Sequence, residues 1–415
     1  MPGKRYYMPP EWAPHKLTLM AWPDNRETWP GIRLNRAEHV YADILEALTP
    51  HEEVMLLVAN EEARQAAASL LQNRNIDWNR VRLIHMPVND VWIRDYGPIS
   101  LLPYDKAKST GRSNSGSSLS AESRGGPDVT AMPGLTGKQT GEQAGRQTGE
   151  QAGKQTGEQG SQAVSDTGGA GAGAPEVVLC DWEYNAWGGK YPPYDFDNAV
   201  PGKLARLLNL PTVAPGMVLE GGSIDVNGAG CLLTTESVLL NPNRNPGLGK
   251  AEIEENLRTW FGIEKVIWLK SGLRGDDTDG HIDDLARFVS ERVIFTTVTD
   301  DTSDPNYETL LENWNILKDA TDIHGNPFEI VELPLPQTRI TGTTVDGSDY
   351  VPASYANFYI ANRCVLVPTY DKRYDDEVLR MFQSVFPDRY IKDVPCNDLV
   401  WGQGSIHCVT QQVIG

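Results

Sequence analysis

The chain has 415 residues, of which 40% are hydrophobic, and a formal net charge of −19. This length is enough for one large hydrophobic core or for two domains. Such an acidic chain lacks the basic surface that nucleic acids require, and it favours small cationic partners instead. No apolar run reaches the roughly 18 residues of a membrane span, and the N-terminal residues lack the apolar segment of a secretory signal. We therefore expect a soluble, cytoplasmic protein that binds neither nucleic acids nor membranes.

A strand, a helix and a second strand are predicted before a sharp change in composition. The apolar run at 54–60 predicts a buried strand, good helix formers follow at 61–72, and another strand is expected at 81–88. Residues 106–174 are largely Gly, Ser, Thr, Gln and Ala, with three copies of an eight-residue unit beginning at 137, 145 and 153. This segment has too little apolar surface to offset the entropy of ordering it. We interpret 106–174 as a disordered low-complexity loop insertion, with a partner-binding tether as the alternative.

The alternation of strands and helices returns after the insertion. Further helices are predicted at 199–209, 250–261, 306–320 and 375–386, and short strands follow the last three at 265–269, 328–334 and 389–394. Together with the helix at 61–72 these make five helices. Their spacing becomes regular once the insertion is subtracted. The rhythm is consistent with five structural repeats or with an ordinary α/β sheet, and periodicity alone leaves both open.

The cysteine pattern argues against disulfide bonds and against a structural zinc site. The cysteines are odd in number, widely spaced and without a CxxC pair; they are Cys180, Cys231, Cys364, Cys396 and Cys408. At least one thiol is therefore free to react.

Four segments rich in glycine and polar residues lie beside predicted strands, where functional sites are commonly built. They span 89–98, 219–230, 275–284 and 401–408. The last of them ends in Cys408, and a thiolate is a strong nucleophile when a base or a cation lies near.

The base for Cys408 has two candidates. His407 is adjacent in sequence, but neighbours on an extended strand point to opposite faces, which makes it a poor partner. His281 lies among acidic residues that could orient its ring and raise its pKa, so it is the better candidate. The alternative for Cys408 is a small buried apolar side chain.

Carboxylates occupy the other three segments. His281 and Asp283 are two residues apart and share a face if that segment is extended. Trp92 and Asp95 combine a flat apolar surface with a carboxylate, and this pairing suits a planar guanidinium group. Glu220 precedes two glycines at the end of a predicted strand. The alternatives are a solvated acidic loop or Mg²⁺/Ca²⁺ site near His281, an internal ion pair at Asp95, and a plain turn at Glu220.

These segments together resemble the agmatine deiminase family of the guanidine-modifying pentein superfamily. The resemblance covers the chain on both sides of the insertion, and its motifs occur in family order: MPPEWAPHKLTLMAWP, LEGGS, LLNPNRNP, GDDTDGH, YANFYIAN and IHCVTQQ. It implies a pentein α/β-propeller of five ββαβ units around a pseudo-fivefold axis. The whole chain, 1–415, would then be a single catalytic domain that the 106–174 insertion interrupts.

The resemblance also implies a role for each candidate residue. Cys408 would be the nucleophile and His281 the general acid and base. Asp95 and Asp283 would hold the guanidinium, and Glu220 would orient His281 and contact the guanidinium. Two further assignments come from the residues themselves. The flat face of Trp92 would add to substrate binding, and we nominate Asp277, an acid just upstream of His281, for the distal ammonium.

The implied reaction is the hydrolysis of agmatine to N-carbamoylputrescine and ammonia through a Cys thiouronium intermediate, within polyamine (putrescine) metabolism. The implied enzyme needs no metal and no cofactor, and the family's habit of forming homo-oligomers extends to this chain as an expectation. The alternatives are a peptidyl-arginine deiminase, which should be exported, and a free-arginine deiminase, which needs a cation for the substrate carboxylate. The non-enzymatic alternative is a module that binds guanidines or polyamines.

Overall fold

The computed structural model describes residues 6–104, 177–337, 344, 347 and 350–415. The described residues up to 104 and those from 177 onward belong to one compact unit. The predicted disorder of 106–174 lies outside the described residues.

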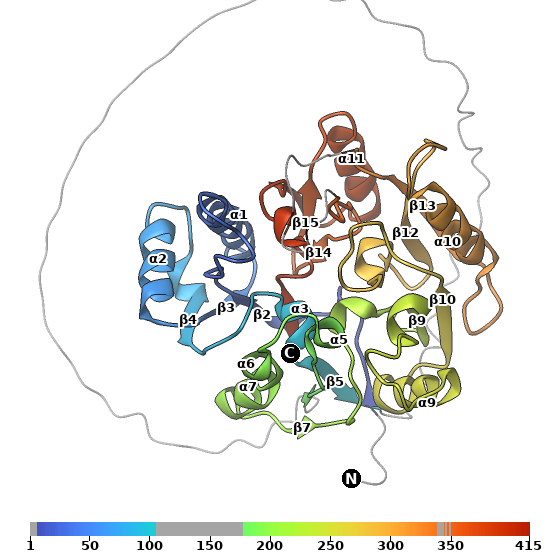
Figure 1. Ribbon diagram of the computed structural model, residues 1–415, viewed down its shortest axis with the longest axis horizontal. Helices are drawn as coiled ribbons and strands as arrows, with labels where there is room; N and C mark the ends of the chain where they lie inside the picture. The colour runs from blue at the N-terminus through green and yellow to red at the C-terminus, as the bar shows by residue number, and fades with distance from the viewer. Residues whose placement is uncertain (1–5, 105–176, 338–343, 345–346, 348–349) are drawn as a thin grey trace, which may run out of the picture. The chain divides into compact units, whose positions relative to one another are not determined.

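Five small sheets carry the described strands, and each of the five contains an antiparallel pair followed by a parallel pair. In each sheet a helix of nine or more residues lies in the connection between two parallel strands (Figure 1). The first sheet has the order β17-β2-β3-β4, and its strands are Gln411–Ile414, His15–Ala21, Glu53–Val58 and Val81–His85. Its connecting helix is α1 (Arg33–Leu48).

The remaining sheets repeat this pattern. The sheet β1-β5-β6-β7 consists of Tyr6–Tyr7, Ile99–Pro103, Val178–Cys180 and Thr212–Val213, with helix α7 (Val200–Leu208). The sheet β8-β9-β10 consists of Asp225–Val226, Cys231–Thr235 and Lys265–Leu269, with α9 (Lys250–Phe261). The sheet β11-β12-β13 consists of Ala286–Phe288, Val293–Val298 and Glu329–Pro334, with α10 (Tyr307–Asp319). The sheet β14-β15-β16 consists of Tyr359–Ile360, Cys364–Thr369 and Tyr390–Pro395, with α11 (Asp375–Val385).

The five predicted helices therefore need one correction. The predicted helix at 61–72 exists as α2 (Glu61–Leu71), but it connects β3 to β4, outside the repeated pattern. The helix that fills the repeated position is α1, which the sequence reading omitted. Buried residues of α1 recur every three or four positions, at Leu34, Ala37, Tyr41, Ile44 and Leu48. The amphipathic signal of this helix was therefore present in the sequence.

Local signals explain where several helices begin and end. Asn60 caps α2 by accepting a hydrogen bond from the backbone N–H of Ala63. Helix α9 ends at Gly262, whose φ of 64° lies in the left-handed region that glycine adopts most easily. None of the described helices is long and apolar enough to cross a membrane. All five cysteines are free and buried.

The remaining elements are short. These are α3 (Ile93–Tyr96), α5 (Ala186–Gly189), α6 (Asp195–Asn198), α8 (Glu236–Leu239) and the 3₁₀ turns η1 (Trp78–Arg80), η2 (Gly221–Ser223), η3 (Ile282–Asp284) and η4 (Val400–Gly402). Four of them, α3, η2, η3 and η4, fall in or overlap the four polar segments. In Figure 1 the longer helices lie toward the periphery of the view, while α3, α5 and the C-terminus lie near its middle. The polar loops of several sheets are thereby brought to one place.

Candidate active site

Cys408 lies in the turn between η4 and β17, and its residue is 8% exposed. The Nδ2 of Asn357 donates to its Sγ over 3.2 Å and also to Oδ1 of Asp284 over 2.9 Å. The backbone N–H of Arg94 donates to the carbonyl of Cys408 over 3.1 Å, which ties this turn to α3. The thiol is therefore held in one place by contacts from two other parts of the chain.

Asp95, His281 and Asp283 meet around Gly222. The Nδ1 of His281 lies 3.6 Å from Oδ1 of Asp95, and the backbone N–H of Gly222 donates to the same oxygen over 3.0 Å. The Oδ2 of Asp283 lies 3.8 Å from the Cys408 Sγ. His281 precedes the 3₁₀ turn that contains Asp283, so the two residues are not on an extended strand as the sequence suggested. The turn nevertheless brings both side chains to the same glycine.

Glu220 is bound in a different way from the one expected. Its Oε1 accepts a hydrogen bond from Nε of Arg244 over 2.6 Å. Arg244 also forms an ion pair with Asp279 and donates from Nη2 to the carbonyl of Thr278 over 2.8 Å. Among the described residues, no hydrogen bond joins Glu220 to the His281 ring. Arg244 therefore links Glu220 to Thr278 and Asp279, in the loop that precedes His281.

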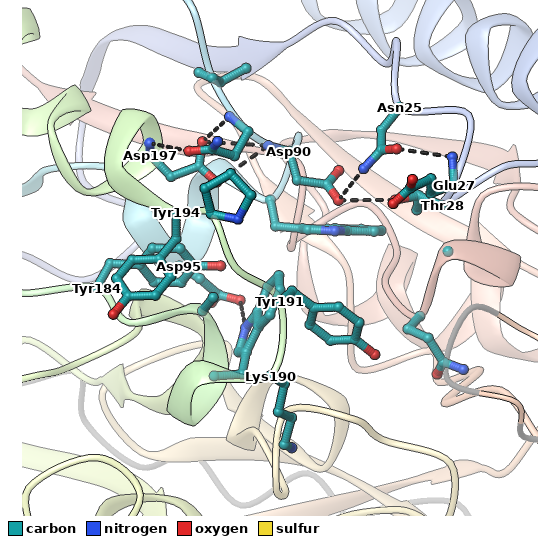
Figure 2. Close-up of a pocket in the computed structure, with 18 of the residues that line it drawn as sticks. Asn25, Glu27, Thr28, Asp90, Asp95, Tyr184, Lys190, Tyr191, Tyr194 and Asp197 are labelled. Atoms are coloured by element: carbon teal, nitrogen blue, oxygen red, sulfur yellow. Dashed lines mark hydrogen bonds between the residues drawn. The ribbon is translucent and has the colours of Figure 1, made fainter.

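A cavity of about 580 Å³ is lined by two of the groups above, Cys408 and Asp95, and its walls also include Trp92, Lys190 and Asp277. Figure 2 shows Asp95, Lys190 and Tyr191 lining this space. Trp92 also packs against Trp29, with 5.6 Å between their ring centroids. The cavity thus combines a thiol, a carboxylate and aromatic surface.

Asp277 is already engaged with a lysine. The Nζ of Lys190 lies 3.6 Å from Oδ1 of Asp277 and donates to Oδ1 of Asp279 over 2.9 Å. Tyr191 donates a hydrogen bond to Oδ2 of Asp277. Asp277, the acid nominated for the distal ammonium, therefore lies in the cavity wall, but the ammonium group of Lys190 lies beside it.

Burial controls the charges of the candidate nucleophile and base. Burial, together with the carboxylates of Asp283, Asp284 and Asp95, raises the pKa of the Cys408 thiol well above its ordinary value. Burial and the Arg244 guanidinium hold the pKa of His281 well below its ordinary value, contrary to the expectation that neighbouring acids would raise it. The site of the free protein therefore contains a neutral thiol and a neutral imidazole.

Burial raises the pKa of the carboxyl groups, as it raises that of the Cys408 thiol. Burial and the nearby Glu220 raise the pKa of Asp95 to about 7, although Trp187 and Gly222 donate hydrogen bonds to it. Burial and the Asp95 carboxylate raise the pKa of Asp283 well above its ordinary value. A cation placed among these groups would restore their negative charge.

Gly222→Ala is expected to reduce activity by about 10²-fold, because small displacements of reacting groups have effects of this size. The added Cβ would lie 2.7 Å from Oδ1 of Asp95 and from Nδ1 of His281, and 3.0 Å from Oδ2 of Asp283. The measurement is kcat/KM together with thermal unfolding. Gly202→Ala is the matched control, since its Cβ would meet nothing closer than Asp181 Oδ2 at 3.5 Å. Equal activities of the two variants would show that the lack of a side chain at Gly222 is not needed for the arrangement of Asp95, His281 and Asp283.

Several residues of the site were missed by the sequence reading. Asn357 lies in YANFYIAN and Arg244 in LLNPNRNP, two motifs that carried the resemblance without being assigned a role. Trp187, whose Nε1 donates to Oδ2 of Asp95 over 2.9 Å, follows an Asn-Ala pair that has no distinctive pattern. Lys190 and Arg26 give the cavity wall the cations that the four polar segments had not clearly supplied.

Comparison with known proteins identifies the family. The Porphyromonas-type peptidyl-arginine deiminase family matches residues 7–116 and 163–413. A Legionella pneumophila protein named "Putative agmatine deiminase" is 33% identical over 410 residues, which covers 98% of this chain and 95% of that protein.

Two solved structures are also similar. An agmatine deiminase of Enterococcus faecalis has a TM-score of 0.75 at 26% identity, covering 99% of this chain and 98% of its own. A Cys-to-Ser variant of the C. jejuni agmatine deiminase, solved with substrate bound, has a TM-score of 0.74 at 25% identity, covering 100% of this chain and 98% of its own. The mixed α/β architecture of the pentein deiminases is thereby confirmed. The chain belongs to the Porphyromonas-type peptidyl-arginine deiminase family, and it is an enzyme that acts on a guanidino group as a C–N hydrolase.

Proposed function

We propose that this enzyme hydrolyses agmatine to N-carbamoylputrescine and ammonia. The observation that carries the proposal is a set of buried polar atoms next to Asp95 and Cys408, which line the cavity. Among the described residues, Oδ1 of Asp283, Oε2 of Glu220 and Nε2 of His281 are buried without a hydrogen-bond partner. Burying a polar atom without a hydrogen-bond partner costs free energy, unless a ligand supplies the missing hydrogen bond. A guanidinium offers several N–H donors in one plane. The agmatine deiminases among the relatives support this choice of ligand.

The binding step follows from the two carboxyl groups. Asp95 and Asp283 would lose their protons as the guanidinium arrives, and their forked hydrogen bonds would hold its plane beside Cys408. The added positive charge would lower the pKa of the thiol, which burial otherwise keeps protonated. The same contacts polarise the central carbon toward attack.

The chemistry then takes two stages. The Cys408 thiol passes its proton to the neutral His281 ring as the sulfur attacks the central guanidinium carbon. The resulting imidazolium returns that proton to the departing amine, which leaves as ammonia, and a covalent thiouronium remains. His281 next takes a proton from water, and the resulting hydroxide displaces the thiolate. The product is the ureido compound. Because the His281 ring is neutral in the free enzyme, it can accept the proton of the attacking water.

The finer architecture is part of the same proposal. We infer that the five sheets are five ββαβ units arranged around a pseudo-fivefold axis, as in a pentein propeller. Their shared order of an antiparallel pair, a helix and a parallel pair supports this inference. The chain would then be one catalytic domain interrupted at 106–174, and it would serve putrescine formation in the cytoplasm, as a homo-oligomer.

Lys190 favours free arginine as the second candidate substrate, because its ammonium could pair with a carboxylate inside the cavity. Asp277 and Asp279 already engage that ammonium, which supports agmatine over arginine. The test is release of ammonia and of the ureido product from agmatine, from arginine and from an arginyl peptide. Turnover of agmatine alone is the expected result, while preference for either arginine form would overturn the assignment.

Asp277→Asn is expected to raise the KM for agmatine by about 10-fold or more, since a charge-assisted hydrogen bond is worth about 1.5–3 kcal/mol. Asparagine keeps the size of the side chain and removes the charge, so the ion pair with Lys190 is lost together with the charge for the distal ammonium. Butylguanidine, which lacks the distal ammonium, serves as the control substrate. Its KM should be the same for the parent and the variant. An unchanged KM for agmatine would remove Asp277 from the ammonium site.

A further inference from the structure

His407 bridges two buried acids beside the cavity. Its Nδ1 lies 2.7 Å from Oδ2 of Asp283, and its Nε2 lies 2.8 Å from Oε2 of Glu11. All three side chains are at most 4% exposed. His407 has no hydrogen bond to the Cys408 thiol among the described residues, so its contacts point to a different role from that of a base for the nucleophile.

The geometry limits how protons can be distributed over these groups. Two short N···O contacts need one proton each, so the imidazole and the two carboxyl groups share two protons. Either the ring carries both protons as an imidazolium between two carboxylates, or one of the acids is protonated. The surroundings of each group decide between these states.

Glu11 is the acid that stays ionised. Burial alone would raise its pKa, but Arg287, His407 and Arg94 hold it well below its ordinary value. The backbone N–H of Ile360 also donates to its Oε1 over 2.7 Å. Glu11 therefore accepts a hydrogen bond from Nε2–H of His407.

Asp283 holds the second proton in the free protein. Burial and the guanidinium groups of Arg287 and Arg94 keep the pKa of His407 well below its ordinary value, so the ring is neutral. Its Nδ1 then has a lone pair, and only a protonated Asp283 can complete a 2.7 Å contact with it. This agrees with the raised pKa of Asp283, which burial and Asp95 cause.

We propose that His407 is a positioning residue that takes the proton of Asp283 when a guanidinium enters the site. The Oδ2–H bond of Asp283 breaks, an Nδ1–H bond forms on His407, and the resulting imidazolium stays between two carboxylates. Asp283 thereby gains the negative charge that the substrate needs, and the proton remains inside the protein. The inference rests on the proposed guanidinium binding.

Both His407 and Asp283 are surrounded by charged and titratable groups. Glu11, Arg94 and Arg287 face His407, and Arg94 Nε also donates to the carbonyl of His407 over 3.2 Å. Asp283 is faced by Asp95, Asp276, Asp284, Cys408, Arg94 and Arg287. Because these arginines keep their charge at all ordinary pH values, changes near neutral pH arise from the acids, the thiol and His407.

The first test is ¹⁵N NMR of the histidine rings in the full-length Cys408→Ser protein, with the His407 signal assigned by its loss in His407→Asn. The expected result without ligand is a neutral ring with its proton on Nε2 and an unprotonated Nδ1. Addition of agmatine should convert the ring to an imidazolium. A proton on Nδ1 in the free protein, or an unchanged ring in the complex, would overturn the relay.

The second test is the pH dependence of kcat/KM for His407→Asn. The asparagine oxygen can accept a hydrogen bond from Asp283 but cannot take its proton, so that proton must leave to solvent. The acidic limb of the profile should therefore move to higher pH, by about one unit for a 10-fold loss at the acidic end. A uniform loss at every pH would mean that His407 is only structural.

His15→Asn is the matched control, because His15 is also buried and also contacts a carboxylate, that of Glu52 over 3.5 Å. It should lower thermal stability and leave the shape of the pH profile unchanged. If His407→Asn does not fold, the NMR signal of His407 can instead be assigned by its loss in His407→Gln, so the NMR test can still be carried out. If agmatine has no effect but guanidinium chloride at low concentration protonates the ring, the relay holds and the proposed substrate is wrong.

Discussion

Replacing Cys408 by alanine should reduce turnover of agmatine by about 10⁴-fold or more, because removal of a covalent nucleophile removes the two-stage route itself. The thiol lies 3.8 Å from Oδ2 of Asp283, and we assign the other oxygen of that carboxylate, Oδ1, to the guanidinium. Because the guanidinium contacts remain without the thiol, the loss should fall on kcat. The measurement is single-turnover release of ammonia, with agmatine binding measured separately by calorimetry.

Cys364→Ala provides the matched control for Cys408→Ala. Cys364 is also a free, buried thiol, but it belongs to β15 and contacts the carbonyl of Ala47 at 3.8 Å. Its replacement should lower stability without changing kcat. Comparable activity of the two alanine variants would contradict the nucleophile assignment, and loss of binding in Cys408→Ala would mean that the thiol mainly shapes the cavity.

Replacing His281 by alanine should reduce kcat by about 10²–10⁴-fold, which is the usual contribution of a general acid and base. Its Nε2 is buried without a partner among the described residues, and its Nδ1 faces Asp95, so the ring is placed for proton transfer. Trapping experiments should then detect the Cys408 adduct in a smaller or slower burst, since both stages need this proton carrier.

His39→Ala is a suitable control for His281→Ala, because His39 is an exposed histidine of α1 whose Nδ1 lies 2.8 Å from the carbonyl oxygen of Asn35. Its activity should equal that of the parent enzyme. If His281→Ala retained activity near that of His39→Ala, then another group must carry the proton, and His281 would have to be reassigned as a structural residue.

Much of the local structure could be predicted from the sequence. The predicted helix 250–261 and strand 265–269 coincide with α9 and β10, and the other predicted helices agree within about one residue at either end. Hydrophobic periodicity and end signals such as Asn60 and Gly262 depend only on near neighbours in the chain. The same local patterns marked the four polar segments that supply Cys408, His281 and Asp95.

Local patterns could not show which helix fills the repeated position between the parallel strands of the first sheet. Both α1 and α2 have the amphipathic pattern of a surface helix. Only the pairing of β2 with β3 and of β3 with β4 shows that α1 fills the repeated position and α2 is additional. Strand pairing depends on packing between distant segments, and a single sequence carries no direct record of it.

By itself, the sequence determined the secondary structure, the family resemblance and the chemically capable residues, because these depend on local composition and order. Only the tertiary structure decided that Gly222 separates Asp95, His281 and Asp283, and that Glu220 binds Arg244. The sequence disfavoured His407 as a base for Cys408 and assigned it no other role. The tertiary structure shows that His407 contacts Asp283, which is 124 positions away in the chain. Contacts over such separations are set by how the sheets pack, and burial in that packing then sets the charge of each group.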